Sequence, residues 1–267
     1  ILFALIKKSD VILHNFRGGV VDRLGLDYES VRAINPSIIY TVISGFGAKG
    51  PRSADPAYDG AVQAAAGMMA NNGTAESGPL RTGYMPVDLM TGMTAAYATT
   101  AALLRKQKTG KGQMVDVAML DCAITLGSAN FSRSEVDDIP DMLIGNQSIA
   151  GAPTASSFPT AEGSILTAAI MPKHVEAFFD ELGRREMLND PKFATPEARM
   201  ENKEIVRDAM IEALKSDTAE NWEKRLAPRG VPVAKINSVK ETARLEQLQY
   251  RNILTAVPAA KGMANGY

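Results

Sequence analysis

The sequence predicts an α/β protein built on a mostly parallel sheet, and three observations carry this prediction. Its 267 residues, 45% apolar and 22% charged, suffice for one large domain or two smaller ones with real cores. The first half alternates helical stretches with short β-branched runs, which is the pattern of strands joined by helices. Between about residues 130 and 160 the chain becomes polar and rich in Gly, Pro and Ser, which predicts a passage into a second domain.

Each element follows from its local pattern. Residues 37–47, SIIYTVISGFG, predict a β-branched strand that runs into a glycine-rich loop, and residues 28–36 predict a helix that ends before Pro36. The run from Asp88 to about residue 107 lacks proline, is rich in helix formers, and ends in basic residues followed by Gly110. The other expected elements are a helix at 1–9, a strand at 10–16, a helix near 58–70, a turn, strand and helix within 110–126, a strand at 165–170, helices near 173–184, 200–215 and 218–230, a strand at 231–236 and a helix at 238–251.

These elements divide the chain into three parts. We expect residues 1–140 to form a large α/β domain, residues 141–236 a linker and a small α+β domain, and residues 237–267 a segment returning toward the large domain. Ile1 stands inside an expected helix, and the final KGMANGY suggests no closing element. The chain is therefore expected to be a fragment of a longer protein, cut at both ends.

The composition excludes several classes of function. The 29 basic and 30 acidic residues give a net charge of −1, so no global field favours nucleic acid or an anionic membrane. The single cysteine, Cys122, cannot form an internal disulfide, which fits a reducing compartment such as the cytoplasm. His14 and His174 lie far apart in sequence, so no zinc site and no other metal are expected. The apolar start is too short and too soon interrupted by charges to span a membrane.

Asp88 is the first candidate for chemistry, because it is the only charged residue between Arg81 and Arg105. It falls at or beside the start of the long predicted helix. One interpretation is an N-cap, in which the carboxylate accepts backbone N–H bonds and contributes about 1 kcal/mol. The other is a covalent nucleophile, kept ionised by the helix N-terminus, with free N–H groups nearby to hold a developing oxyanion. The residues alone leave both open.

Two loops are candidates for ligand binding. Residues 14–26, HNFRGGVVDRLGL, follow the first strand and place Asn15, Arg17 and Arg23 around a glycine turn, which suits guanidinium groups directed at phosphate. The alternative is a solvated turn with two surface arginines. Residues 44–60 contain four glycines and two prolines after a strand, so their backbone can approach a ligand closely, although an irregular crossover would look the same.

Taken in order, these stretches resemble the class III CoA-transferase family, also called CaiB/BaiF, which includes formyl-CoA transferase, carnitine CoA-transferase and the α-methylacyl-CoA racemases. The resemblance covers nearly the whole chain and is most specific in the first half. It implies a Rossmann-like large domain with a smaller α+β domain, an interlocked homodimer, and coenzyme A bound as an acyl-CoA substrate. The matching stretches are residues 10–51, 56–69, 86–121, 145–165 and 229–241.

The resemblance also assigns roles to individual residues. Asp88 matches the catalytic aspartate of the family, and Asp59 matches an acidic position at the family spacing, although its role stays open, as does that of His174. The implied coenzyme A contacts are of two kinds. The nucleotide is expected to meet Asn15, Phe16, Arg17 and Arg23, and the region of the thioester is expected to meet Pro56, Ala57 and Tyr58.

The family contains two chemistries, and the residues favour one of them. Racemisation needs two bases on opposite faces of the α-carbon, and the resemblance places a histidine and an acidic residue at positions that here hold Tyr58 and Met171. A phenol and a thioether are poor substitutes. We therefore expect transfer of coenzyme A between an acyl-CoA and a small carboxylic acid through a covalent intermediate on Asp88. A 2-methylacyl-CoA racemase or epimerase, and a CoA-binding relative without turnover, are the alternatives.

Overall fold

The computed structural model describes residues 1–255, which form two compact units, Ile1–Gly145 and a second that begins at Asn146. The finer division of the second part at residue 236 stays a prediction. Residues 256–267 of the expected return segment lie outside the described residues.

The first unit is organised around a three-stranded sheet whose order is β1-β2-β5. The strands are β1 (Val11–His14), β2 (Ile39–Ser44) and β5 (Gln113–Ala118), and both pairings are parallel, as the alternation of helices and strands predicts. The central strand β2 is buried over its first four residues, which explains its near-continuous apolar sequence. The carboxyl ends of all three strands therefore meet at one edge of the sheet.

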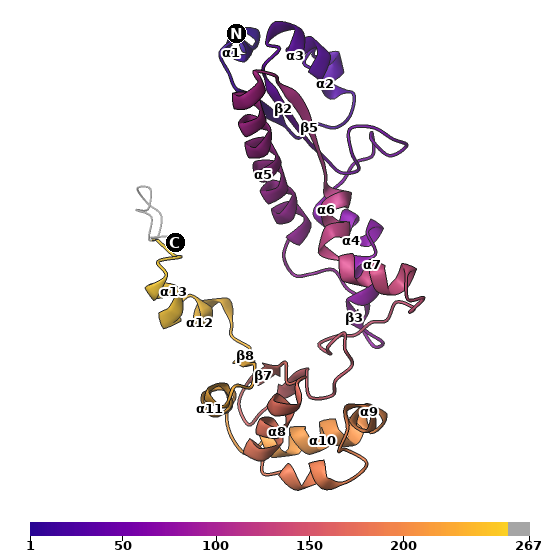
Figure 1. Ribbon diagram of the computed structural model, residues 1–267, viewed down its shortest axis with the longest axis vertical. Coiled ribbons are helices and arrows are strands. Elements are labelled where there is room, and N and C mark those ends of the chain that lie inside the picture. Colours follow the sequence, from indigo (N-terminus) through magenta and orange to yellow (C-terminus); the bar gives the residue numbers. More distant parts are fainter. Residues whose placement is uncertain (256–267) are drawn as a thin grey trace. The chain divides into compact units, whose positions relative to one another are not determined.

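Successive residues of β2 pack against different helices because side chains alternate along a strand. Ile39 belongs to the core formed with α5 (Pro86–Thr109), and the Thr41 hydroxyl lies 2.8 Å from that of Thr99 on this helix. Tyr40 and Val42 instead belong to the core with α1 (Leu2–Ile6) and α3 (Tyr28–Ile34). Figure 1 shows α5 running alongside β2 and β5.

The remaining elements of the first unit are short. Gly110 ends α5 in a left-handed conformation, with φ of 70°, as its place after the basic residues predicts. The others are α2 (Val20–Arg23), α4 (Asp59–Ala65), the 3₁₀ helix Met68–Asn71, a two-stranded antiparallel pair β3 (Gly73–Thr74) and β4 (Gly78–Pro79), α6 (Met119–Leu126) and α7 (Ser128–Glu135).

The second unit has its own antiparallel sheet and its own aromatic core. The sheet order is β6-β7-β8, and Phe158, Phe178 and Trp222 are buried among the helices. Its elements are β6 (Ser157–Pro159), β7 (Ser164–Thr167), α8 (Pro172–Glu181), the 3₁₀ helix Arg185–Asn189, α9 (Pro196–Glu201), α10 (Lys203–Leu214), α11 (Ala219–Leu226), the 3₁₀ turn Ala227–Arg229, β8 (Val233–Lys235), α12 (Val239–Thr242) and α13 (Glu246–Tyr250). None of the described helices has the length and hydropathy needed to cross a lipid bilayer.

Candidate active site

A cavity of about 540 Å³ opens at the carboxyl edge of the parallel sheet, between the strand ends and the N-terminus of α5. Ligands of α/β proteins bind preferentially at this edge, because loops following several strands converge there. The lining residues come from the turn after β1, the end of β2, the loop before α4, and the first turns of α5 and α6. They are Asn15, Phe16, Arg17, Gly18, Ile43, Ser44, Gly45, Ser53, Asp55, Ala57, Tyr58, Asp88, Thr91, Gly92 and Met119.

Asp88 lies inside the first turn of α5, as its third residue, and its side chain does not cap the helix. The N-cap residue is Met85, and the Asp88 carboxylate forms no hydrogen bond or ion pair with any residue of the described part of the chain. Asp88 is exposed and lines the cavity. The capping interpretation of Asp88 is therefore wrong, and its carboxylate is left free to react with a ligand.

The capping function belongs to Asp59, the first residue of α4. Its buried carboxylate, only 5% exposed, accepts the backbone N–H of Val87 at 2.9 Å and that of Asp88 at 3.0 Å. A helix leaves its first N–H groups without partners, and a carboxylate is well suited to satisfy them. Sequence reasoning left Asp59 without a role, because a cap supplied from 29 residues away leaves no local pattern.

A buried amide fixes Asp59 in turn. Gln63, one turn along α4 and 1% exposed, donates from Nε2 to Asp59 and to the hydroxyl of Thr82. The Gln63 carbonyl oxygen accepts the Thr82 N–H at 3.0 Å, and the Thr82 hydroxyl donates to the carbonyl of Tyr84 at 2.9 Å. This network ties α4, the loop before α5 and the first turn of α5 into one assembly that holds the backbone of Asp88.

The same contacts overturn the expectation that free N–H groups beside Asp88 hold an oxyanion. The N–H groups of Val87 and Asp88 are both occupied by Asp59, and the N–H of Leu89 bonds to the carbonyl of Met85 at 3.2 Å. Pro86, the first helical residue, has no N–H. The first turn of α5 therefore orients Asp88 but offers no donor to a ligand.

The surroundings of Asp88 favour the neutral form of its carboxyl, compared with an aspartate side chain free in water. Burial raises the pKa of the Asp88 carboxyl above the ordinary aspartate value, and the negative charge of Asp59 raises it further. The residue as a whole is exposed and lines the cavity, so its carboxyl remains accessible to a ligand. A carboxylate with a raised pKa is more basic, which makes its ionised form a stronger nucleophile.

Two glycines allow the loop before α4 to close over the strand ends. A Cβ built at Gly45 would lie 2.3 Å from the Cβ of Ala57, and one at Gly18 would lie 2.8 Å from the carbonyl oxygen of Ser53. Neither distance is possible for real atoms. Gly18 and Gly45, both in the predicted ligand-binding loops, therefore serve close backbone approach, which brings Ala57 and Tyr58 to the cavity.

A smaller cavity of about 150 Å³ adjoins the turn after β1 and shares Phe16, Arg17, Gly18, Ser44 and Ser53 with the first. His14 supports this turn: its Nδ1 accepts the N–H of Phe16 at 3.3 Å, and its Nε2 lies 3.0 Å from the hydroxyl of Tyr40. Since the Tyr40 hydroxyl donates to the carbonyl of Leu26, the His14 proton resides on Nε2. Burial lowers the pKa of His14, which favours this neutral form. Sequence reasoning missed His14 as a support for the turn.

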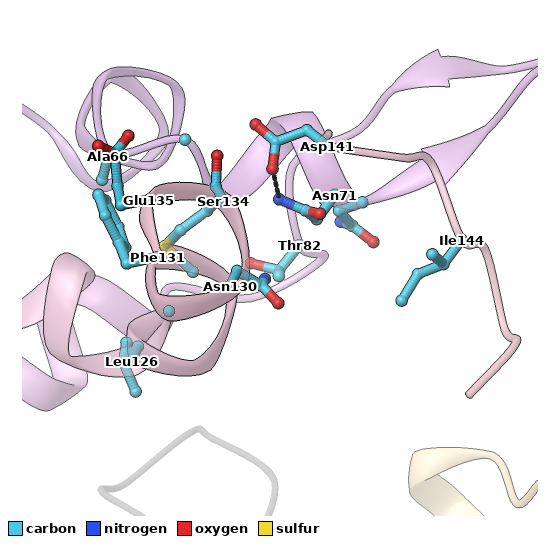
Figure 2. Close-up of a pocket in the computed structure, with 14 residues that line it drawn as sticks. Ala66, Asn71, Thr82, Leu126, Asn130, Phe131, Ser134, Glu135, Asp141 and Ile144 are labelled. Carbon is cyan, nitrogen blue, oxygen red and sulfur yellow. Dashed lines mark hydrogen bonds between the residues drawn. The ribbon is translucent and has the colours of Figure 1, made fainter. Parts of the chain in front are cut away.

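A third cavity, of about 340 Å³, lies between the 3₁₀ helix Met68–Asn71 and α7 (Figure 2). Asn71 donates from Nδ2 to the carboxylate of Asp141 at 2.9 Å on its rim. The charged side chains that line it are the carboxylates of Glu135 and Asp141, which repel phosphates and carboxylic acids. It contains none of the predicted site residues, so the cavity beside Asp88 is the candidate site.

Residues 1–266 match the model of CoA-transferase family III. The chain belongs to this family. The resemblance seen in the sequence is therefore confirmed, and solved family structures share the fold. A CaiB/BaiF family protein from Brucella suis superimposes with a TM-score of 0.84 at 30% identity, over 96% of this chain and 67% of that one.

Curated family members carry transferase names. The acetyl-CoA:oxalate CoA-transferase of Acetobacter aceti is 35% identical over 95% of this chain and 65% of its own length. The succinate–glutarate CoA-transferase of Agrobacterium fabrum is 31% identical over 97% of this chain and 64% of its own length. The chain thus spans slightly less than two thirds of these relatives.

The structure brings together most of the residues that family resemblance selected. Six of the eight line the cavity, namely Asn15, Phe16, Arg17, Ala57, Tyr58 and Asp88. Arg23 and Pro56 line neither this cavity nor the smaller one beside it. Arg23 belongs to α2, and its guanidinium lies beside Gly19, at the border of the smaller cavity.

Proposed function

We propose that the protein is a CoA-transferase that moves coenzyme A between an acyl-CoA and a carboxylic acid, with Asp88 as its covalent nucleophile. The observation that carries this proposal is the free carboxylate of Asp88 on the cavity wall, relieved of capping by Asp59. Membership of CoA-transferase family III and the transferase names of its relatives support it.

The proposed reaction needs only carboxylate and thiolate exchange. An oxygen of Asp88 attacks the thioester carbonyl, the C–S bond breaks, and CoA thiolate leaves an acyl-aspartyl anhydride. The thiolate attacks the aspartyl carbonyl and expels the donor carboxylate, which leaves an aspartyl-CoA thioester. The acceptor carboxylate attacks this thioester, forms a new anhydride and expels thiolate again. Attack of the thiolate on the acceptor acyl carbon releases the new CoA ester and restores the Asp88 carboxylate.

The charge balance of the site fits this sequence. Ionised Asp88 stands near the negative charge of Asp59, and acylation of Asp88 makes it neutral. The repulsion between the two carboxylates is therefore present in the resting site and relieved in the covalent intermediates. Because acylation removes this repulsion, the repulsion favours attack by Asp88 on the thioester.

Arg17 is the proposed anchor for the phosphates of coenzyme A. Its side chain is exposed, lines both adjoining cavities, and forms no ion pair with the residues described. A guanidinium in this state is suited to phosphate oxygens. Phe16, 51% exposed beside it, offers an apolar ring to the nucleotide. Roles of Asn15 and Arg23 in nucleotide binding, and of Pro56, Ala57 and Tyr58 near the thioester, stay predictions.

The proposed acceptors are short dicarboxylic acids, because relatives are named for oxalate and glutarate. A Rossmann-like large domain, an interlocked homodimer and a cytoplasmic location belong to the same proposal. The dimer is supported by apolar side chains exposed along α5. Four of them, Leu89, Met93, Tyr97 and Leu104, are at least 55% exposed, and such a row is costly to leave in water.

The test is a transfer assay on the full-length protein. Acetyl-, formyl- and succinyl-CoA are each incubated with isotopically labelled oxalate, glutarate or succinate, and labelled CoA esters are measured by mass spectrometry. We expect one donor–acceptor pair to turn over, and incubation with acyl-CoA to add the mass of coenzyme A minus water at Asp88. Absence of both products across the panel would overturn the proposal in favour of a CoA-binding protein.

A further inference from the structure

Gly92 occupies the interior of the long helix α5, where glycine is the poorest helix former after proline. Its φ is not positive, so no unusual backbone conformation calls for glycine. A Cβ built at Gly92 meets no heavy atom within 4 Å. In contrast, a Cβ at Gly45 or at Gly112 would lie within 2.3 Å of a neighbouring atom. The packing of the described chain therefore gives no reason for glycine at position 92.

The position of Gly92 relative to Asp88 supplies a reason. Residues four apart lie on the same helix face, about 6 Å apart along the axis, and helical side chains lean toward the N-terminus. A side chain at position 92 would therefore lean over the carboxylate of Asp88. Both residues line the same cavity, so this side chain would enter the space in front of the nucleophile.

The neighbouring walls of the cavity are fixed. Thr91 is 2% exposed and its hydroxyl donates to the carbonyl of Val87 at 2.7 Å, while Met119 is 8% exposed within the core that includes Val62. Neither side chain has room to retreat. A group added at position 92 would therefore reduce the space beside Asp88.

We propose that Gly92 is a specificity-determining residue that reserves room for the acyl group carried on Asp88. This inference rests on the proposed function, because the anhydride stages of transfer place the donor and the acceptor acyl group in turn at this point. The open space beside Gly92 then sets how large an acyl group the site accepts. Glycine at position 92 makes α5 less stable than alanine would, and it keeps this space open.

The experiment compares Gly92→Ala and Gly92→Val with wild type in the full-length protein, and Ala101→Val is the matched control. Ala101 is an exposed residue of the same helix that lines none of the cavities found in the first unit. Each variant is tested for thermal unfolding, for native mass, and for kcat/KM with acetyl-, propionyl- and butyryl-CoA. Non-reactive S-alkyl-CoA analogues of matching length give dissociation constants that do not require turnover.

We expect Gly92→Ala to raise the midpoint of thermal unfolding while it lowers kcat/KM, by about 10-fold for the larger acyl groups and less for acetyl. Gly92→Val should extend the loss to acetyl, and Ala101→Val should leave kcat/KM unchanged for all three acyl groups. The affinity for long S-alkyl analogues should fall in parallel, which tests the inference even if wild type catalyses no transfer. Unchanged kinetics, an equal loss for every acyl length, or a lower unfolding midpoint for Gly92→Ala would overturn the inference.

Discussion

Replacement of Asp59 should damage both the stability of the first unit and the acid–base behaviour of Asp88. Asp59 accepts two backbone N–H groups of α5 at 2.9 and 3.0 Å while 5% exposed. Hydrogen bonds to a charged group contribute about 1.5 kcal/mol each at the lower end, so Asp59→Ala should cost about 3 kcal/mol. For a protein of this size, that loss lowers the unfolding midpoint by about 6–12 °C.

Asp59→Asn separates the charge from the hydrogen bonds. The carbonyl oxygen of the new asparagine can still accept the N–H groups of α5. Its NH₂ group, however, then faces the NH₂ group of Gln63, and two donors cannot form a hydrogen bond with each other. The double variant Asp59→Asn with Gln63→Glu removes this conflict, because the carboxylate introduced at position 63 accepts from the new amide and from the N–H of Thr82. The Thr82 hydroxyl, which accepts from Gln63 in the wild type, must then turn to donate to this carboxylate, at the expense of its bond to Tyr84. We expect the double variant to recover part of the stability that the single variant loses.

The pH profile distinguishes an electrostatic role from a purely structural one. Asp88 must be ionised to attack, so activity is lost as the pH falls through its pKa. The negative charge of Asp59 contributes to raising that pKa, and Asp59→Asn should therefore move the acid limb of kcat in the full-length protein to lower pH. Asp10→Asn is the control, because it removes a charge paired with Lys106, about 27 Å away along α5. An acid limb that stays in place, or moves to higher pH, would refute the reasoning.

Four further outcomes follow from the site. Asp88→Asn should reduce the rate of transfer by several orders of magnitude. The raised pKa of Asp88 means that its ionised form is disfavoured in the folded state, so Asp88→Asn should not lower the unfolding midpoint at pH 7. Removal of a capping residue would instead cost about 1 kcal/mol of stability. Arg17→Ala should raise the KM for acyl-CoA more than that for the acceptor acid, and equal effects would count against phosphate binding. Arg23→Ala should raise the KM for acyl-CoA less than Arg17→Ala does, since Arg23 lies outside both cavities. With a 2-methylacyl-CoA in deuterated water, no deuterium should enter C2, since Tyr58 and Met171 are poor bases, and rapid exchange without transfer would identify a racemase.

The sequence by itself determined the features that depend on local pattern. Alternating helical and β-branched runs predicted the parallel strands β1, β2 and β5, and the proline-free run after Asp88 predicted α5 and its end at Gly110. Each of these follows from the period of apolar residues or from a residue with special backbone preferences. The order of the motifs also identified the family, which the family match confirms.

Only the tertiary structure decided what surrounds Asp88. A side chain at the start of a long helix is as suitable for capping as for chemistry, and the choice depended on a carboxylate 29 residues earlier in the chain. In the folded chain, Asp59 also accepts the N–H groups of Val87 and Asp88, which were expected to be free. Arg23 lies outside both cavities. Hydrogen bonds to a helix terminus can come from any part of the chain that packs there, so they leave no periodic trace in the sequence.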